Sequence, residues 1–212
     1  MPRPKQRTPA LRERVLRVAV ETLAADGISG FTTRKVAAGA DTSTNAVYEL
    51  FGDKAGLIRA VFFEGFRELR QRFDELATTD DPRADLLAVL QAIRRFVAEN
   101  PVLAEVMFSQ PFAAFDPGPA DLEAGNAVRR VVVARVRRAL EAGLLAGNET
   151  DIAHVLLALV QGLAAQEAAG WLGTSRASID RRWTLALNAT LDGLHPNAGG
   201  TTVTPRPRHA TR

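Results

Sequence analysis

The residues of this chain best suited to recognition chemistry lie in one short stretch, STNAVYELFGDKAGL, at residues 43–57. It contains the single tyrosine of the sequence, Tyr48, in a helical pattern of about two turns between a capping serine and a glycine. Its apolar residues recur at helical spacing and are expected to point inward: Val47, Leu50 and Phe51. This spacing places Asn45, Tyr48 and Glu49 on the outer face.

A helix this short needs its neighbours for stability, and its polar face suits a DNA major groove, which admits one helix. Asn45 can form a bidentate bond with adenine, and Thr44 and Ala46 can contact a thymine methyl group. The Tyr48 hydroxyl can donate to a phosphate. Glu49 would repel phosphates unless it accepts a hydrogen bond from a cytosine amino group.

Helical spacing and caps predict three helices that position this face, at about 10–26, 33–39 and 44–51. Gly27 follows the first helix, and Thr32 and Ser43 can cap the second and third. Because a four-residue turn joins the second and third, the pattern is that of a helix-turn-helix.

The starts of the second helix and of a fourth helix capped by Asp53 expose backbone N–H groups that anions prefer. The expected DNA-binding residues are Thr32, Thr33, Arg34, Ser43, Thr44, Asn45, Ala46, Tyr48 and Lys54. A flexible basic arm, residues 1–9 with Arg3, Lys5 and Arg7, could reach a minor groove. The alternative for the arm is a disordered, solubilising terminus.

The rest of the chain also predicts helices and no strands, which makes the fold class all-α with about nine helices. The expected later helices are residues 53–76, 82–100, 101–112, 120–146, 150–172 and 175–194. Asp81 can cap the helix that starts at residue 82. We expect a helix-turn-helix domain at 10–54, a helical body at 55–195 and a disordered tail at 196–212, which is rich in Pro, Gly and Thr.

Composition excludes several function classes. With no cysteine, the chain has no disulfide, no cysteine-ligated zinc and no thiol nucleophile. His154, His195 and His209 are far apart, so no metal site is expected, and neither a nucleophile elbow nor a glycine-rich phosphate loop occurs. We therefore expect no enzyme activity and no cofactor. No apolar run reaches about 18 residues, so we expect a cytoplasmic protein without a membrane partner.

Charge is distributed unevenly along the chain. Residues 1–60 hold ten Lys and Arg against six Asp and Glu, whereas residues 61–195 hold fourteen against eighteen. A basic N-terminal lobe on an acidic body suits a polyanion at one end, although many solvated helical surfaces are equally uneven.

The ordered string from Arg14 to Phe62 resembles the N-terminal domain of TetR-type transcriptional regulators. The matching positions are Gly27, Thr32 to Ala37 and Ser43 to Lys54. Asp41 replaces the usual turn glycine, and Leu50 replaces an aromatic residue; Asp accepts left-handed backbone angles better than most residues. Residues 156–170 resemble the penultimate helix of a branch with a WHG-type C-terminal domain, here with Leu157 and Gln161-Gly162.

The resemblance implies a homodimer through the last two helices and a small-molecule pocket in the body. The implied dimer residues are Val155, Leu159, Leu163, Trp171, Trp183, Leu187 and Leu191. The implied pocket residues are Phe96, Met107, Phe108, Gln110, Phe112, His154 and Gln161. The alternatives are a buried hairpin in a monomer and plain core; an apolar lining would suit a mostly apolar effector.

These observations favour a ligand-responsive regulator, a repressor that binds a near-palindromic operator. The rival hypothesis is a helical adaptor or ligand-binding protein of the same fold without specific DNA binding, with Glu49 and Asp41 as the visible signs. A third, a small helical enzyme, lacks any clustered catalytic residues.

Overall fold

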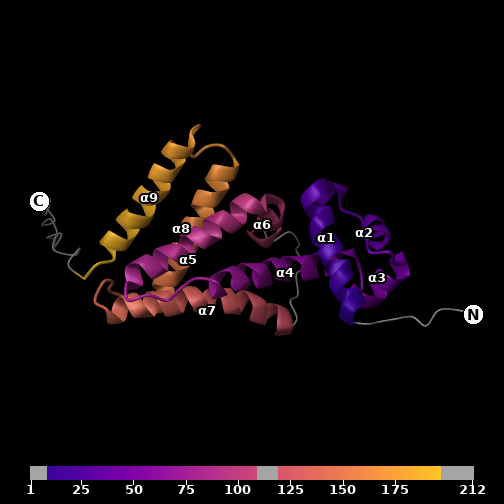
Figure 1. Ribbon diagram of the computed structural model, residues 1–212, viewed down its shortest axis with the longest axis horizontal. Helices are drawn as coiled ribbons and strands as arrows, with labels where there is room; N and C mark the ends of the chain where they lie inside the picture. The colour runs from indigo at the N-terminus through magenta and orange to yellow at the C-terminus, as the bar shows by residue number, and fades with distance from the viewer. Residues whose placement is uncertain (1–8, 109–118, 197–212) are drawn as a thin grey trace, which may run out of the picture.

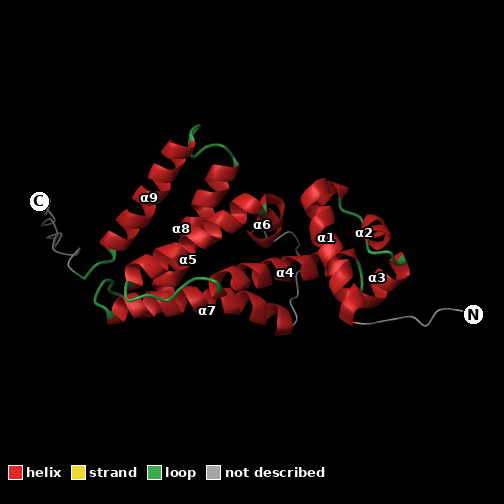
Figure 2. Ribbon diagram, in the orientation of Figure 1, coloured by secondary structure: helices red, strands yellow, loops and turns green. Residues whose placement is uncertain are grey.

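The computed structural model describes residues 9–108 and 119–196, and all regular structure in those ranges is helical (Figure 2). The prediction of an all-α fold is thereby confirmed. The helices are α1 (Pro9–Gly30), α2 (Thr33–Gly39), α3 (Thr44–Phe51), α4 (Lys54–Asp74), α5 (Pro82–Glu99), α6 (Pro101–Phe108), α7 (Pro119–Glu141), α8 (Glu149–Ala168) and α9 (Arg176–Gly193).

Side-chain caps explain where most of these helices begin. In each case an oxygen of the capping residue accepts a hydrogen bond from a backbone N–H in the first turn, which satisfies a donor without a partner in the helix. The capping residues are Thr32, Ser43, Asp53, Asp81, Asn148 and Ser175. The first four of these caps were predicted from the sequence.

Among the described residues, three helix ends differ from the prediction by four or five residues. Helix α8 ends at Ala168 instead of near residue 172. Helix α1 continues to Gly30, but Gly27 interrupts its geometry with φ 66°, so the break lies where the sequence predicts one. Helix α7 ends at Glu141 instead of near residue 146. Gly143, with φ 69°, turns the chain there, and the N–H of Leu144 bonds to the carbonyl of Ala139, which satisfies a terminal carbonyl.

The molecule is elongated, with α1, α2 and α3 grouped at one end and α4 running from them into the body (Figure 1). Within the body, α4 packs against α5, α6 and α7, and α7 packs against α5 and α8. Helix α8 starts beside α7, and the α8–α9 hairpin extends from there so that the turn between the two helices lies away from α7 (Figure 1). Buried side chains from these helices and from the α1–α2 connection form the core, among them Phe31, Leu57, Phe96, Val132, Leu156 and Trp183.

Helix α6 lies where the α1–α3 group meets the body, because it packs against both α1 and α4. The approach to α4 is close: a Cβ atom on Gly65 would lie 2.3 Å from Sδ of Met107 and 3.2 Å from Cγ of Leu103. A side chain at position 65 would therefore push the two helices apart, so glycine at this position allows their close packing.

None of the described helices is both long enough and apolar enough to cross a membrane.

Candidate nucleic-acid interface and effector pocket

Helix α3 is fixed at both ends. Oγ of Ser43 accepts a hydrogen bond from the N–H of Ala46 at 3.1 Å, and the N–H of Gly52 bonds to the carbonyl of Tyr48 at 2.7 Å. The turn before it passes through Asp41 with φ 47°, the left-handed conformation that the sequence predicts Asp to tolerate. Because both ends are bonded, this two-turn helix holds one orientation.

The inward face of α3 is the predicted one. Val47 is fully buried, and Leu50 and Phe51 are partly buried and pack against the core. The guanidinium of Arg12 on α1 lies over the Phe51 ring, 5.1 Å from its centroid. The apolar residues therefore attach α3 to its neighbours and leave the opposite side uncovered.

The outer face of α3 is polar. Asn45 and Glu49 are exposed, and 43% of the Tyr48 surface is accessible. Nδ2 of Asn45 donates a hydrogen bond to Oε1 of Glu49 at 3.0 Å, one helical turn along. The sequence predicts this face, but sequence reasoning missed the hydrogen bond between the two side chains. The available signal was their spacing, because residues four positions apart on a helix are neighbours.

The surrounding residues that were predicted to bind DNA differ in exposure. Thr32, Arg34 and Lys54 are exposed, and Thr44 and Ala46 are half-buried beside the outer face. The oxygens of Thr32 and Ser43 are engaged as helix caps, so these residues offer backbone groups more readily than hydroxyls.

Thr33 corrects the prediction. Its residue exposure is only 5%, because the first turn of α2 packs into the core, so its side chain does not reach a phosphate. Its backbone N–H lies at the positive end of α2. The predicted phosphate contact of Thr33 is therefore restricted to this backbone group. The predicted arm residues Arg3, Lys5 and Arg7 lie outside the described residues.

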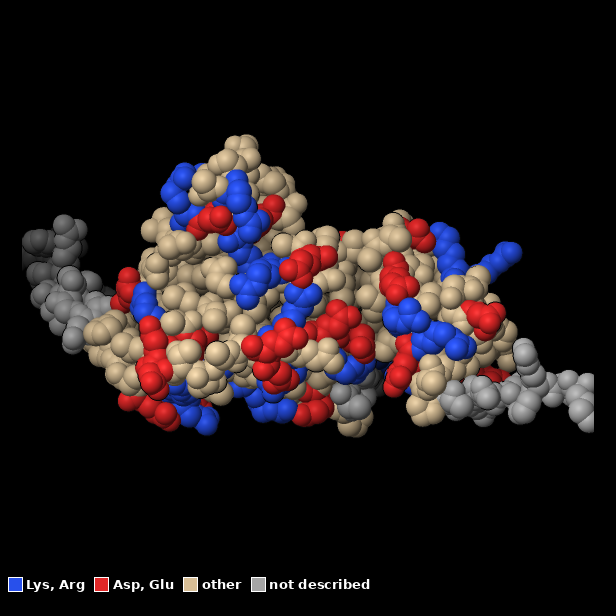
Figure 3. All heavy atoms as spheres, viewed as in Figure 1, with Lys and Arg blue, Asp and Glu red and all other residues tan. Residues whose placement is uncertain are grey.

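Lys/Arg and Asp/Glu alternate over the face of the molecule that Figure 3 shows. Near α2, Nζ of Lys35 is paired with the carboxylate of Asp26 at 3.0 Å. Attraction of a polyanion would therefore depend on individual exposed cations such as Arg34 and Lys54 rather than on one broad basic surface in this view.

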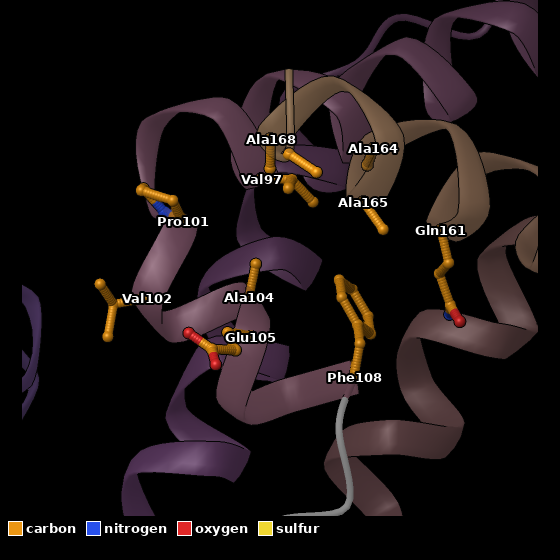
Figure 4. A pocket seen from close by; sticks show the side chains of 11 residues that line it. Val97, Pro101, Val102, Ala104, Glu105, Phe108, Gln161, Ala164, Ala165 and Ala168 are labelled. Carbon is orange, nitrogen blue, oxygen red and sulfur yellow. The ribbon is translucent and has the colours of Figure 1, made fainter. Parts of the chain in front are cut away.

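A cavity of about 470 Å³ lies between the end of α5, helix α6 and the second half of α8 (Figure 4). Phe108 projects from α6 toward α8, where Ala165 and Gln161 lie (Figure 4). The lining is apolar except for Glu105 and Gln161: Val97, Pro101, Val102, Ala104, Phe108, Ala164, Ala165, Ala168 and Ala169. Its size and lining are those of a small-molecule site.

Of the predicted pocket residues, Phe108 and Gln161 line this cavity. Phe96 and Met107 do not, because their side chains are buried in the core on the far sides of α5 and α6. His154 is also wrong: it is exposed near the start of α8, and its Nδ1 lies 2.8 Å from the carbonyl of Thr150. Gln110 and Phe112 lie outside the described residues.

The predicted dimer residues divide between two environments. Trp183, Leu187 and Leu191 are almost fully buried within the protomer, so their side chains cannot face a second subunit without unfolding the body. Leu159 and Leu163 are partly buried, whereas Val155 and Trp171 are exposed, Trp171 at 78%. Leu185, outside the predicted set, is 69% exposed on the opposite side of α9 from the buried residues.

A buried charged cluster holds α9 on the body, and sequence reasoning missed it. Arg94 on α5, with 8% of its side chain exposed, forms two hydrogen bonds with Glu167 on α8 at 2.8 and 3.0 Å. Nε1 of Trp183 donates a hydrogen bond to Glu167 at 2.6 Å, and the Arg94 guanidinium lies over the Trp183 ring. Arg94 and Glu167 are 73 positions apart, so no pattern of neighbouring residues indicates that they form a bond.

The charges in this cluster are stabilised by each other. Burial alone would raise the pKa of Glu167, but the hydrogen bonds from Arg94 and Trp183 outweigh it and hold that pKa below its usual value. The pKa of Arg94 is raised, since burial is outweighed by its bonds to Glu167 and Asp180. The cluster therefore remains ionised and acts as a structural tie.

Among residues 9–108 and 119–196, no group of three or more His, Asp or Glu side chains is arranged to hold a metal ion.

Two family models match the chain. Residues 15–61 match the one described as bacterial regulatory proteins, tetR family, and residues 86–190 match the tetracyclin repressor-like C-terminal domain. The first covers all of α2 and α3, and the second covers the three helices that line the cavity, except for the first residues of α5.

One curated relative is the HTH-type transcriptional regulator BetI of Stenotrophomonas maltophilia (strain R551-3). It is 33% identical over 84 residues, which are 39% of this chain and 43% of that protein. The similarity therefore spans less than half the length of either protein.

Two solved structures have the same fold. A protein with unknown function from Rhodococcus sp. RHA1 has a TM-score of 0.75 and 28% identity, over 91% of this chain and 99% of that one. The TetR family transcriptional regulator PfmR from Thermus thermophilus has a TM-score of 0.61 and 18% identity, over 82% and 97%. The second similarity shows the fold alone.

Proposed function

Because this chain belongs to the TetR family of bacterial transcriptional regulators, we propose that it is a ligand-responsive repressor. It binds a near-palindromic operator as a homodimer, and a small, mostly apolar effector releases it. The observation that carries this proposal is the uncovered polar face of α3, Asn45 with Tyr48, fixed on the protein by fully buried Val47.

In DNA binding, α3 enters the major groove and its outer residues divide the work. Asn45 reads a base edge, and half-buried Thr44 and Ala46 approach a thymine methyl group. Tyr48, Arg34 and Lys54 bind phosphates and set the position of the helix without reading sequence. Support comes from the exposure of Asn45, Tyr48, Arg34 and Lys54 and from the caps that orient α2, α3 and α4.

The homodimer uses the exposed sides of α8 and α9. Val155 on α8, Leu185 on α9 and Trp171 in the turn between these helices are large apolar side chains in contact with solvent, and such residues favour association when they share a surface. A two-fold dimer would place two copies of α3 about one DNA turn apart, roughly 34–36 Å, which requires a near-palindromic operator.

The effector occupies the cavity between α5, α6 and α8, and the path from it to α3 runs through α6. Ala104 and Phe108 line the cavity, whereas Leu103 and Met107 of the same helix lie against Gly65 on α4. Helix α4 in turn packs on α1 and α3. An effector that displaces α6 would therefore tilt α4 and change the separation of the two reading helices.

Such an effector must bind the arrangement that is unsuited to DNA more tightly than the DNA-bound one, since equal affinity would shift nothing. A coupling free energy of about 1–3 kcal/mol is typical. By linkage, operator DNA must lower effector affinity by the same factor that effector lowers DNA affinity.

The test is a mobility shift with duplexes from the promoter regions of the chain's own gene and its neighbours, with random DNA of the same length as the control. A repressor should retard one duplex specifically and lose affinity steeply as salt rises, because phosphate contacts release counterions. A folded dimer with no sequence-specific retardation at any salt concentration would refute the proposal and favour the adaptor.

A further inference from the structure

A carboxylate on the DNA-facing side of α3 requires an explanation. Glu49 is exposed on the same face as Asn45 and Tyr48, where phosphates of a bound duplex would repel it. It also accepts a hydrogen bond from Nδ2 of Asn45 at 3.0 Å. The two side chains therefore present one connected polar surface rather than two independent ones.

This bond determines which atoms of Asn45 can meet a base. An ionised carboxylate only accepts hydrogen bonds, so the amide nitrogen of Asn45 must point at Glu49 and Oδ1 must point elsewhere. One amide hydrogen is engaged, which leaves the second hydrogen and Oδ1 for a base edge. Glu49 can accept more than one hydrogen bond at a time, because a carboxylate offers about four lone-pair sites.

The base edges of the major groove differ in how they would meet this acceptor. Guanine offers two acceptors, and thymine an acceptor and a methyl group, so both leave a carboxylate without a donor. Adenine offers an amino donor beside the N7 acceptor, whereas cytosine offers its N4 amino group alone. A negatively charged acceptor therefore discriminates most strongly in favour of cytosine.

We propose that Glu49 is a specificity-determining residue that accepts a hydrogen bond from the N4 amino group of a cytosine in each operator half-site. Asn45, oriented by Glu49, reads a different base pair of the same half-site. The carboxylate lowers affinity for every sequence that lacks an amino group at this place, so it works by exclusion as much as by attraction. This inference rests on the proposed function and identifies the DNA that it recognises.

The first experiment selects bound sequences from a randomised duplex pool with the wild-type protein, Glu49→Gln and Asn45→Ala. Glu49→Gln is the matched variant, because glutamine keeps an acceptor for Asn45 and nearly the same shape but has no charge and gains a donor. Both positions are exposed, so circular dichroism should show unchanged helix content.

The wild type should select cytosine at one position in each half-site. Glu49→Gln should lose that preference about tenfold or turn it toward adenine, which glutamine binds bidentately, and should bind random DNA more tightly because a negative charge has gone. Asn45→Ala should keep the cytosine and relax a different position. A structural role for Glu49 alone would leave the selected base unchanged in Glu49→Gln.

The second experiment tests the hydrogen bond itself on the selected duplex. In N4-methylcytosine, placed at the cytosine position that the wild type selects, a methyl group replaces the amino hydrogen that faces the major groove. In 5-methylcytosine that hydrogen remains. The wild type should lose about tenfold affinity with the first base and little with the second, and Glu49→Gln should respond less to N4-methylation.

Two results would overturn the inference while leaving the repressor proposal intact. The first is a selected site in which no position shows a cytosine preference that Glu49→Gln removes. The second is an equal loss of affinity for N4-methylcytosine in the wild type and in Glu49→Gln. Failure of the wild type to select any sequence would instead refute the proposed function, and the inference with it.

Discussion

The outer face of α3 and the α8–α9 hairpin arrange polar and apolar side chains in opposite ways. On α3, Asn45 and Tyr48 face solvent and Val47 is buried. On the hairpin, apolar Trp171 and Leu185 are exposed, while charged Glu167 is largely covered beside Trp183.

The difference shows when local spacing predicts orientation. Helix α3 is covered on one side only, so the apolar residues of its short pattern must all point to that side. Helices α8 and α9 carry apolar residues on more than one face, such as exposed Val155 and Leu185 opposite the buried residues, so local spacing alone does not fix which face turns inward. The faces that turn inward are the one that carries Trp183 and the one on which Glu167 pairs with Arg94, because a buried charge needs a partner.

The largest expected effect comes from removing the buried tie. Arg94→Ala leaves Glu167 with its burial but without its bidentate partner, which should cost about 3–5 kcal/mol of unfolding free energy. Chemical denaturation would measure the loss. The matched control is Arg130→Ala, which breaks the exposed pair with Glu123 on α7 and should cause no measurable change. Equal effects would mean that the buried cluster is not what holds the hairpin.

The corrected orientation of α9 can be tested with two leucines that lie two residues apart. Leu187→Ala opens a cavity in the core and should cost about 2–5 kcal/mol of unfolding free energy. Leu185→Ala should change it by no more than about 0.5 kcal/mol but weaken self-association, measured by sedimentation at several concentrations. If Leu185→Ala unfolds the protomer as strongly as Leu187→Ala, the assigned faces are wrong.

On α3, base reading and phosphate binding can be separated. Asn45→Ala should cost about 1–3 kcal/mol on the operator and relax base preference at one position. Tyr48→Phe should cost about 1 kcal/mol on operator and random duplexes alike, because it removes only a phosphate contact. Titrations of both variants on both duplexes check this; an equal loss from Asn45→Ala on the two duplexes would contradict its role in base reading.

The smallest effect at neutral pH concerns a second buried acid, Asp85 at the start of α5. Burial would raise its pKa, but hydrogen bonds from the Thr79 backbone and from Arg138 outweigh it and lower the pKa below its usual value. A lowered pKa contributes stability that is present above about pH 4 and is lost as pH falls through the native-state pKa. Denaturation measured from pH 7 downward should show that loss.

The matched variant for this acid is Asp85→Asn, which has no carboxyl group to titrate. Its unfolding free energy should decline less between pH 5 and the acid limit than that of the wild type. Parallel declines in the two proteins would assign the acid sensitivity to other groups, Glu167 among them, whose pKa is shifted in the same direction.

Much of the fold and of the α3 face follows from sequence reasoning. The caps Thr32, Ser43, Asp53 and Asp81 predict four helix starts, and the spacing of Val47, Leu50 and Phe51 predicts which side of α3 remains uncovered. These signals are local: a cap acts within one helical turn, and the face of a short helix depends on a few successive residues.

The cavity and the inner face of the hairpin could not be predicted in the same way. Phe96 and Phe108 are both aromatic residues near the α5–α6 turn, yet only Phe108 lines the cavity. Nothing in the local pattern distinguishes them, because the outcome depends on where α8 lies.

The sequence by itself indicated the helices, the caps Thr32, Ser43, Asp53 and Asp81 and the polar side of α3, since these features depend on the types and spacing of residues close together along the chain. Only the tertiary structure decided that Trp183 faces inward, that Arg94 meets Glu167 and that an apolar cavity opens beside Gln161. These outcomes depend on packing between helices far apart in the chain, where a side chain is buried only if a distant surface fits it.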